Sequence, residues 1–325
     1  MTRRAWLAFA AISVIWGIPY LFIRIAVRDG VTPAVLAWGR VTLAALVLLA
    51  LAWRAGTLPT LAGHWRWLLA YAVAEITIPF PLIAAGEQHV ASSLAAITIS
   101  TVPLIVALLA LRFDHAERPT PTRALGLLIG FGGVIALLGV DIGGSTDQLG
   151  GTGAILLAAV GYAIGAMLIK HRLGGLDPRA TMGASLGLAA LLLAPVAALD
   201  PPRAAPPAGA IASVIVLGLV CTAAAFVIFT VLIREAGTSR ATVITYVNPV
   251  VAVALGVTLL GERPGAGAAA GLLLILAGSW LSTGGRLPPR LIELGARLRS
   301  RANRRRRAAA ASAADRLAEA GPTRS

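Results

Sequence analysis

The stretch TVPLIVALLALRFDHAERPTPTRALGLLIGFGG, residues 101–133, returns later in the chain as VNPVVAVALGVTLLGERPGAGAAAGLLLILAG, residues 247–278. Each copy contains an apolar segment with a proline, a short turn with Glu-Arg-Pro, and a glycine-rich apolar segment. Chance accounts for matching leucines, but hardly for the proline, the turn and two glycines in register with a one-residue gap. The chain therefore contains an internal repeat. The matched residues are Pro103 with Pro249, Glu117-Arg118-Pro119 with Glu262-Arg263-Pro264, Gly126 with Gly271, and Gly133 with Gly278.

The composition around the repeat is that of a membrane protein. The 325 residues are 58% hydrophobic and 13% charged, and the mean hydropathy is +0.83, whereas soluble domains carry about 25% charged residues. A hydrocarbon core of ~30 Å needs about 20 apolar residues per helical span, and backbone groups without water must bond within a helix. The pattern predicts an all-α, polytopic bundle of ten transmembrane helices. Their predicted ranges are 5–25, 33–53, 65–85, 91–111, 122–140, 150–169, 179–199, 209–232, 238–260 and 265–284.

The repeat unit has about five helices, and this odd number predicts its orientation. The second half must enter the membrane upside down, so we expect two inverted five-helix repeats, residues 1–140 and 141–284, followed by a basic tail, residues 285–325. Inverted repeats around a midplane site are a recurring plan of secondary transporters. The alternative is that the duplication only makes a stable bundle.

Arginine and lysine predict the topology. With a cytoplasmic N-terminus, twelve basic residues before the tail fall inside and four outside, as the positive-inside rule requires. The tail, with eleven of the 28 basic residues, then also lies inside. Its run Arg304-Arg305-Arg306-Arg307 is better explained by anionic membrane lipid than by nucleic acid. We therefore expect a multi-pass protein of the bacterial inner membrane with both termini cytoplasmic.

Several functional classes lack support in the sequence. The single cysteine, Cys221, excludes an intramolecular disulfide, and the four histidines show no metal-binding spacing. No Walker motif is present, so the sequence predicts no ATP hydrolysis, and we expect neither a metal nor a cofactor. A lipid-modifying membrane enzyme is an alternative, but no His or Asp cluster at a membrane face and no Ser-His pairing supports it.

Charged residues inside spans are the best candidates for function, because they are costly there and face a cavity or a partner. Glu75 is predicted near the midplane of the third span, and Arg40 lies about two turns into the second. The functional interpretation is that Glu75 takes up a proton or binds a cationic group, while Arg40 holds an anionic group. The alternative is a structural Arg40–Glu75 ion pair.

Polar and aromatic residues at helical spacing are predicted to complete a substrate-binding cavity. Prolines Pro79 and Pro81 are expected to loosen the helix above Glu75. The alternatives are ordinary packing for Trp16 and intrahelical hydrogen bonds for the threonines, including Thr98 and Thr101. The predicted substrate-binding residues are Trp16, Tyr20, Arg40, Tyr71, Glu75, Thr245, Tyr246 and Asn248.

Other conspicuous residues are assigned structural roles. Glu117 and Glu262 lie at opposite membrane faces and are predicted to cap the helices that follow them. Arg24 and Arg28 are expected to reach the lipid headgroups. Pairs of glycines four residues apart predict close helix packing; they are Gly126 and Gly130, Gly161 and Gly165, and Gly267 and Gly271.

The order of motifs over the two halves resembles the EamA-type branch of the drug/metabolite transporter superfamily, from about residue 5 to residue 284. The resemblance implies ten helices, an inverted repeat and export or uptake of small metabolites. One departure is Glu87-Gln88-His89, where family members more often end the motif with an aromatic residue. The pieces that carry the resemblance are Ile15-Trp16-Gly17 through Phe22-Ile23-Arg24, Leu36-Ala37-Trp38-Gly39-Arg40, the block from Pro103 to Gly133, Gly161-Tyr162-Ala163, and the block from Asn248-Pro249 to Gly278.

These observations predict a secondary active transporter of a small metabolite or amino-acid-like solute. We expect it to be an exporter that is proton-coupled or works by exchange. A lipid flippase of the same fold is an alternative that no sequence feature excludes. The sequence predicts neither the substrate nor the oligomeric state.

Overall fold

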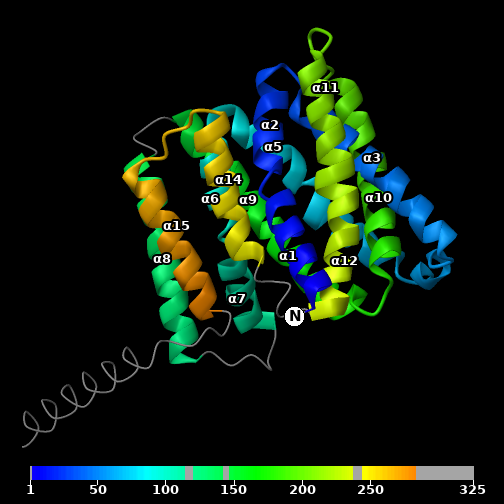
Figure 1. Ribbon diagram of the computed structural model, residues 1–325, viewed down its shortest axis with the longest axis horizontal. Helices are drawn as coiled ribbons and strands as arrows, with labels where there is room; N and C mark the ends of the chain where they lie inside the picture. Colours follow the sequence, from blue (N-terminus) through cyan, green and yellow to red (C-terminus); the bar gives the residue numbers. More distant parts are fainter. Residues whose placement is uncertain (1, 114–119, 142–145, 237–243, 283–325) are drawn as a thin grey trace, which may run out of the picture. The chain divides into compact units, whose positions relative to one another are not determined.

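The computed structural model describes residues 2–113, 120–141, 146–236 and 244–282, and over these ranges the chain is helical without strands (Figure 1). Predictions that rest on residues 114–119 and 237–243, including Glu117 as a helix cap, lie outside the described residues. The basic tail, residues 285–325, also lies outside the described residues.

Within the described ranges, seven helical stretches are long and apolar enough to cross a membrane. Three further helices contribute shorter apolar segments, of which the first is Pro121–Leu137 within α8. The 16 and 17 residues of the last two correspond to roughly 25 Å of helix. Each predicted span overlaps one of these ten stretches. The seven long stretches are α1–α2 (Arg3–Ile15, Pro19–Arg28), α3 (Pro33–Arg54), α4–η2–α5 (Trp65–Tyr71, Ala72–Thr77, Pro79–His89), α6–α7 (Ser92–Ile99, Val102–Phe113), α9–η3 (Thr146–Leu168, Ile169–Leu173), α10 (Pro178–Leu199) and α11–η4–α12 (Ala208–Ile215, Val216–Ala224, Ala225–Ala236). The three further helices are α8 (Pro121–Asp141), α14 (Ile244–Leu259) and α15 (Ala266–Ser282). A short 3-10 turn, η1 (Leu58–Leu61), lies between α3 and α4.

Several of these stretches are interrupted near their middle. The first is broken between Ile15 and Pro19, and the fourth between Ile99 and Val102. The third stretch, α4–η2–α5, contains the π-helical turn η2, and the stretch α11–η4–α12 contains the π-helical turn η4. In the third, Pro79 begins α5, one residue after the end of η2. Because proline has no N–H, the carbonyl of Glu75 loses its usual partner four residues on. The N–H of Ile78 donates to the carbonyl of Val73, five residues back. This agrees with the loosening that Pro79 and Pro81 predict.

Helix ends are fixed by short polar side chains. Thr2 and Thr32 accept hydrogen bonds from the first turns of α1 and α3. Asp177 caps α10 by accepting from the backbone of Arg179 and Ala180. The side chain of Arg179 also bonds to Asp177 and holds the pKa of that carboxyl below its usual range.

Glycines bring α8 and α15 into close antiparallel contact (Figure 1). A Cβ on Gly126 would lie 2.7 Å from the carbonyl oxygen of Gly278, and one on Gly133 would lie 2.9 Å from that of Gly271. Early residues of α8 thus meet late residues of α15. Gly130 also packs tightly, against Leu104, so the small residues predicted to serve packing do so here.

Helices α3 and α10 form a second antiparallel pair. Thr32, which precedes α3, donates a 2.7 Å hydrogen bond to the carbonyl of Asp200 at the far end of α10, and Gly183 near the start of α10 packs on Leu48. Further neighbours are α6 with α14, α1 with α12, α2 with α11, and α5 with α9.

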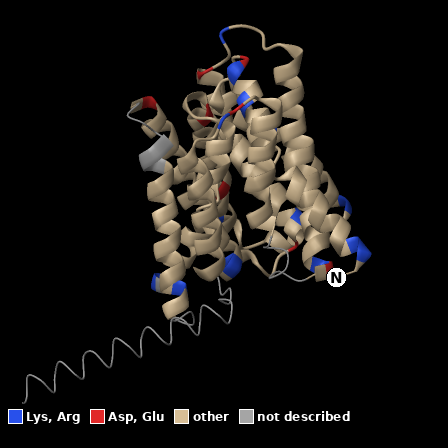
Figure 2. Ribbon diagram, turned by 60° about the vertical axis from the view of Figure 1, so that its left-hand side comes forward, with Lys and Arg blue, Asp and Glu red and all other residues tan. Residues whose placement is uncertain are grey.

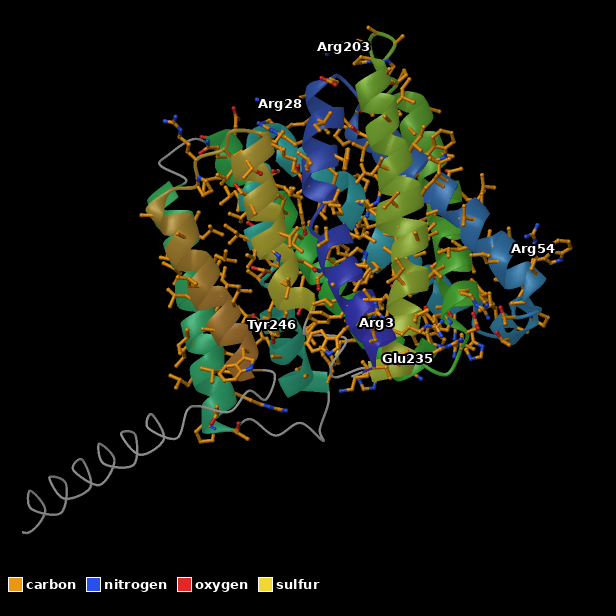
Figure 3. All side chains as sticks on the ribbon, in the orientation of Figure 1. Arg3, Arg28, Arg54, Arg203, Glu235 and Tyr246 are labelled. Carbon is orange, nitrogen blue, oxygen red and sulfur yellow. The ribbon has the colours of Figure 1, made fainter. Side chains whose placement is uncertain are left out.

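The surface of the bundle fits a lipid environment. Large apolar side chains such as Leu46, Leu128, Leu191 and Leu273 are strongly exposed. Most charged residues lie toward the two ends of the bundle (Figure 2). Arg28 and Arg203 mark one end and Arg3 and Glu235 the other (Figure 3); we call them the Arg28 end and the Arg3 end. The protein is therefore a multi-pass membrane protein.

Candidate functional site

A cavity of about 320 Å³ lies among the interrupted helices, and this volume falls at the lower end of the range of small-molecule sites. Its wall is mostly apolar and aromatic, with a few polar groups. The lining residues are Trp16, Pro19, Tyr20, Ile23, Arg40, Glu75, Ile76, Phe80, Ile83, Ala96, Ile99, Ser100, Val102, Pro103, Tyr162, Ala166, Leu186, Cys221, Thr222, Phe226, Thr245, Asn248 and Pro249.

Six of the eight predicted binding residues line this cavity, namely Trp16, Tyr20, Arg40, Glu75, Thr245 and Asn248. Tyr71 and Tyr246 are not part of the lining. Tyr71 is buried, and its hydroxyl lies 3.5 Å from the sulfur of Met182. Tyr246 is half-buried (Figure 3). Contact with substrate stays a prediction for all eight.

Arg40 is held in place from two sides. The side chain is 9% exposed; its Nε donates to Thr222 Oγ1 at 2.9 Å, and its guanidinium carbon lies 4.1 Å from the centroid of the Phe80 ring. Thr222 in turn donates to the carbonyl of Leu217 within η4. Stacking and a directed N–H bond fix the plane of a guanidinium, so Arg40 presents a rigid positive charge to the cavity.

Glu75 lies on the π-helical turn η2, across from α9. A Cβ on Gly165 of α9 would collide with the Glu75 carboxyl, and one on Gly161 would meet the Ala74 carbonyl and Pro79. The two glycines therefore form the groove in which η2 lies. In the described part of the chain, the buried Oε2 of Glu75 has no hydrogen-bond partner.

Arg40 and Glu75 do not form the ion pair that was the structural alternative. Within the residues that the structure describes, the ion pairs closer than 4.0 Å that it gives are Arg4–Glu235 and Arg179–Asp177. The cavity thus contains a positive group and a carboxyl that do not neutralise one another directly. Ionisable side chains that face a cavity inside a membrane bundle typically mark the path of a substrate or an ion.

Backbone breaks surround the cavity. Trp16 lies in the gap between α1 and α2, Ser100 in the gap between α6 and α7, and Glu75 and Thr222 on π-helical turns. Irregular backbone at membrane depth is tolerated where it is buried in protein or lines a cavity, and π-turns are frequent at functional sites.

Other polar residues named from the sequence have structural contacts. Thr98 and Thr101 donate to backbone carbonyls within one turn, at 2.8 and 2.7 Å, which is the alternative that the sequence left open. The amide of Asn248, oriented with its nitrogen toward two carbonyls, reaches Ile244 and Ser13 at 3.0 Å each. Asn248 therefore joins α14 to α1 at the cavity wall.

Sequence reasoning did not select five prominent residues of the wall, namely Phe80, Tyr162, Cys221, Thr222 and Phe226. The signal that could have found them is the internal repeat, because lining residues of the two halves correspond at a constant separation of 146 positions. The corresponding lining pairs are Trp16 with Tyr162, Tyr20 with Ala166, Arg40 with Leu186, Glu75 with Cys221, Ile76 with Thr222, Phe80 with Phe226, Ile99 with Thr245, Val102 with Asn248, and Pro103 with Pro249.

Two of these nine pairs combine a charged residue with an uncharged one. Arg40 corresponds to Leu186, and Glu75 corresponds to Cys221. None of the other seven pairs includes a charged residue, and two of them, Phe80 with Phe226 and Pro103 with Pro249, are identical. The first half therefore supplies both charged groups of a wall that both halves build.

A second polar region lies at the Arg28 end. Glu262, in the connection between α14 and α15, accepts hydrogen bonds from the backbone N–H groups of Ser92 and Ser93 at 2.7 and 2.9 Å. Burial raises the pKa of Glu262, but the hydrogen bonds of Ser93 and Ser92 outweigh it, so the net pKa lies below the usual value. The prediction that Glu262 caps the following helix is thus corrected, because it caps α6 instead.

Arg24 also differs from its prediction. Its Nη1 donates to the backbone carbonyl of Glu87 at the end of α5, so it binds protein rather than reaching only for headgroups. Arg28, one turn further along, is exposed (Figure 3).

Comparison with known proteins places this architecture in a family. The EamA-like transporter family model matches residues 3–139 and again residues 149–284. The inner membrane transporter YedA of Escherichia coli, itself uncharacterized, is 32% identical over 266 residues, which are 78% of this chain and 82% of YedA. An uncharacterized transporter of Archaeoglobus fulgidus is 23% identical and covers 87% of this chain and 98% of its own length.

A solved crystal structure shares the fold, with a TM-score of 0.62 at 21% identity over 86% of this chain and 97% of the other. Two family matches that together span most of the helical region agree with the resemblance stated from the motifs. The chain belongs to the EamA-like transporter family.

Proposed function

We propose that this protein is a secondary active transporter of a small, amino-acid-like solute, that it exports this solute, and that a proton is moved in the same cycle. The observation that carries the proposal is the cavity with one rigid arginine and one carboxyl that are not paired with each other. The ten apolar helices are its transmembrane spans, with both termini on the cytoplasmic side of the inner membrane.

Helix contacts support an inverted arrangement of the two halves. Gly126 and Gly133 of α8 correspond in sequence to Gly271 and Gly278 of α15. Gly126 packs on Gly278, while Gly133 packs on Gly271. Such reciprocal contacts are self-complementary, as a two-fold axis produces, and α8 and α15 run antiparallel. An axis in the membrane plane accounts for both features and lets the halves rock around one site.

The cavity wall suggests how a solute is held. Arg40 binds an anionic group of the solute, such as a carboxylate, because a guanidinium can bond to both carboxylate oxygens. The aromatic rings of Trp16, Tyr162 and Phe226 cover apolar parts of the solute. Glu75 takes up a proton or pairs with an ammonium group, since an isolated ionised carboxylate is costly at that depth.

The experiment is a transport assay on the full chain in proteoliposomes, with radiolabelled small solutes that carry a carboxylate and a lipid-scrambling assay on the same vesicles. Arg40→Lys should raise the apparent KM by about tenfold or more, because lysine can neither stack on Phe80 nor keep the Nε bond to Thr222. The matched control is Arg54→Lys, because Arg54 is an exposed residue at the end of α3 (Figure 3).

Wild-type flux of a solute with a weakened Arg40→Lys variant and an unchanged Arg54→Lys variant supports the proposal. Lipid scrambling by the wild type without solute flux contradicts it and favours a flippase. An unchanged KM in Arg40→Lys removes Arg40 from substrate binding.

A further inference from the structure

Glu87 is a buried acidic residue that the cavity does not include. Its side chain is 0% exposed near the end of α5, and it is not among the lining residues. Both carboxyl oxygens of Glu87 lack a hydrogen-bond partner in the described part of the protein. Two buried carboxyl oxygens without partners thus lie close to the corner between α5 and α6.

The charged groups that act on Glu87 come from several elements. They are Arg24 of α2, Glu262 of the connection between α14 and α15, and Arg40 of α3; Tyr20 is also influenced by Glu87, and His89 on the same helix is exposed. Arg24 donates to the backbone carbonyl of Glu87 rather than to its carboxyl. Over the described residues the structure gives no ion pair to Glu87 within 4.0 Å.

This geometry is unfavourable for an ionised side chain. A buried carboxylate needs hydrogen bonds or a close cation, and a group without either becomes neutral instead. The nearby guanidinium bonds to an uncharged carbonyl, which is the expected choice when the carboxyl carries no charge. The arrangement therefore fits a neutral, protonated Glu87.

The corner that contains Glu87 is connected both to the cavity and to a contact between the halves. Tyr20 lines the cavity and lies close enough to both Glu87 and Arg40 to interact with them electrostatically. Two residues separate α5 from α6, whose first N–H groups are held by Glu262. A movement of α6 away from α14 breaks those bonds and exposes the corner to water.

We infer that Glu87 is a second proton-binding site, separate from Glu75, which holds a proton while the Arg28 end is packed as in this structure and releases it when that end opens. On opening, the O–H bond of the carboxylic acid breaks and the proton passes to water. The carboxylate that remains is then paired by Arg24, which exchanges its bond to the carbonyl for one to the carboxylate. The inference rests on the proposed transport cycle for its role, but not for its protonation.

The test is infrared spectroscopy of the purified full chain in lipid at pH 7, which records the carbonyl stretching band of protonated buried carboxyls. Glu87→Gln should remove one component of this band, and Glu87→Asp should shift it, because the shorter side chain places its carboxyl differently. Glu75→Gln should leave that component in place. The matched control is Glu235→Gln, a carboxyl at the Arg3 end that bonds to Thr2.

A wild-type band that neither Glu87→Gln nor Glu87→Asp changes overturns the inference, because Glu87 is then ionised. If Glu87→Gln does not fold, the shift in Glu87→Asp decides. The infrared result needs no solute, so it stands apart from the transport assay; absence of solute flux with a Glu87 band present refutes the proposed function alone.

Discussion

At the scale of single residues, Arg40 and Glu75 differ in how firmly the protein holds them. Arg40 is fixed by Phe80 and Thr222, whereas the buried Oε2 of Glu75 has no hydrogen-bond partner among the described residues. A fixed cation suits recognition of a group that never changes its charge. A carboxyl with unsatisfied bonding capacity suits a group that gains and loses a proton within the cycle.

We therefore expect Glu75→Gln to abolish proton-coupled transport while the protein stays folded. In the assay, the initial rate of solute flux should fall by about tenfold or more. Glutamine is nearly isosteric but cannot exchange a proton. The measurement is solute flux against pH in proteoliposomes, with Glu235→Gln as the control carboxyl variant. A Glu75→Gln protein that transports with the wild-type pH profile would mean that Glu75 plays no part in coupling.

Both charged residues of the site could be chosen from the sequence, since charges in apolar spans are rare and costly. Tyr162 and Phe226 could not, because an aromatic residue in a span looks alike whether it faces lipid, another helix or a cavity. Glu87 was noted only as a departure from the family pattern. Its burial depends on α2, α6 and the connection after α14, which no local pattern contains.

At the scale of elements, the π-helical turn η2 and the glycine face of α9 form one unit. Gly165 leaves room for the Glu75 carboxyl and Gly161 for the Ala74 carbonyl. The sequence predicted close packing from the spacing of these glycines, but not that the neighbour would be the carboxyl of the site. Small residues in membrane helices are visible in sequence, whereas the surface they admit is set by tertiary packing.

Gly165→Ala should therefore displace Glu75 and lower the rate of solute flux by about tenfold. The loss of thermal stability should be small in comparison with this loss of flux. Gly153→Ala on the same helix is the matched control, because a Cβ there meets nothing within 4 Å. Flux and thermal unfolding of both variants, measured side by side, provide the check. Equal transport by the two variants would show that the α9 groove does not position Glu75.

The contact between α8 and α15 offers a stability test with adjacent residues. A Cβ on Gly133 would lie 2.8 Å from the backbone nitrogen of Ile275, while one on Gly132 meets nothing within 4 Å. Gly133→Ala should destabilise the protein by roughly 1–3 kcal/mol, as overpacking does, and Gly132→Ala should be neutral or slightly stabilising. Thermal unfolding in detergent distinguishes them; the reverse order would contradict the close contact of these helices.

At the scale of the whole molecule, the sequence located each apolar helix that the described ranges contain, because hydrophobic length and Pro- or Gly-rich connections are local signals. It did not place the breaks at Trp16 and Ser100 or the π-turn η4, which depend on how neighbouring helices meet. The repeat register, carried through the whole chain, relates nine pairs of cavity residues. Both halves thus contribute residues to the cavity wall, but its two ionisable residues, Arg40 and Glu75, both belong to the first half.

The central claim is that this cavity is the path of the solute, and Cys221 tests it most directly. Cys221 is the only cysteine in the chain, so a thiol reagent can be used on the wild-type protein. It lines the cavity and is the counterpart of Glu75 in the second repeat. The measurement is the rate at which a small thiol reagent modifies Cys221 in lipid vesicles, with and without a solute that the protein transports. We predict that saturating solute slows modification at least severalfold, whereas an unchanged rate at saturating solute would contradict the account.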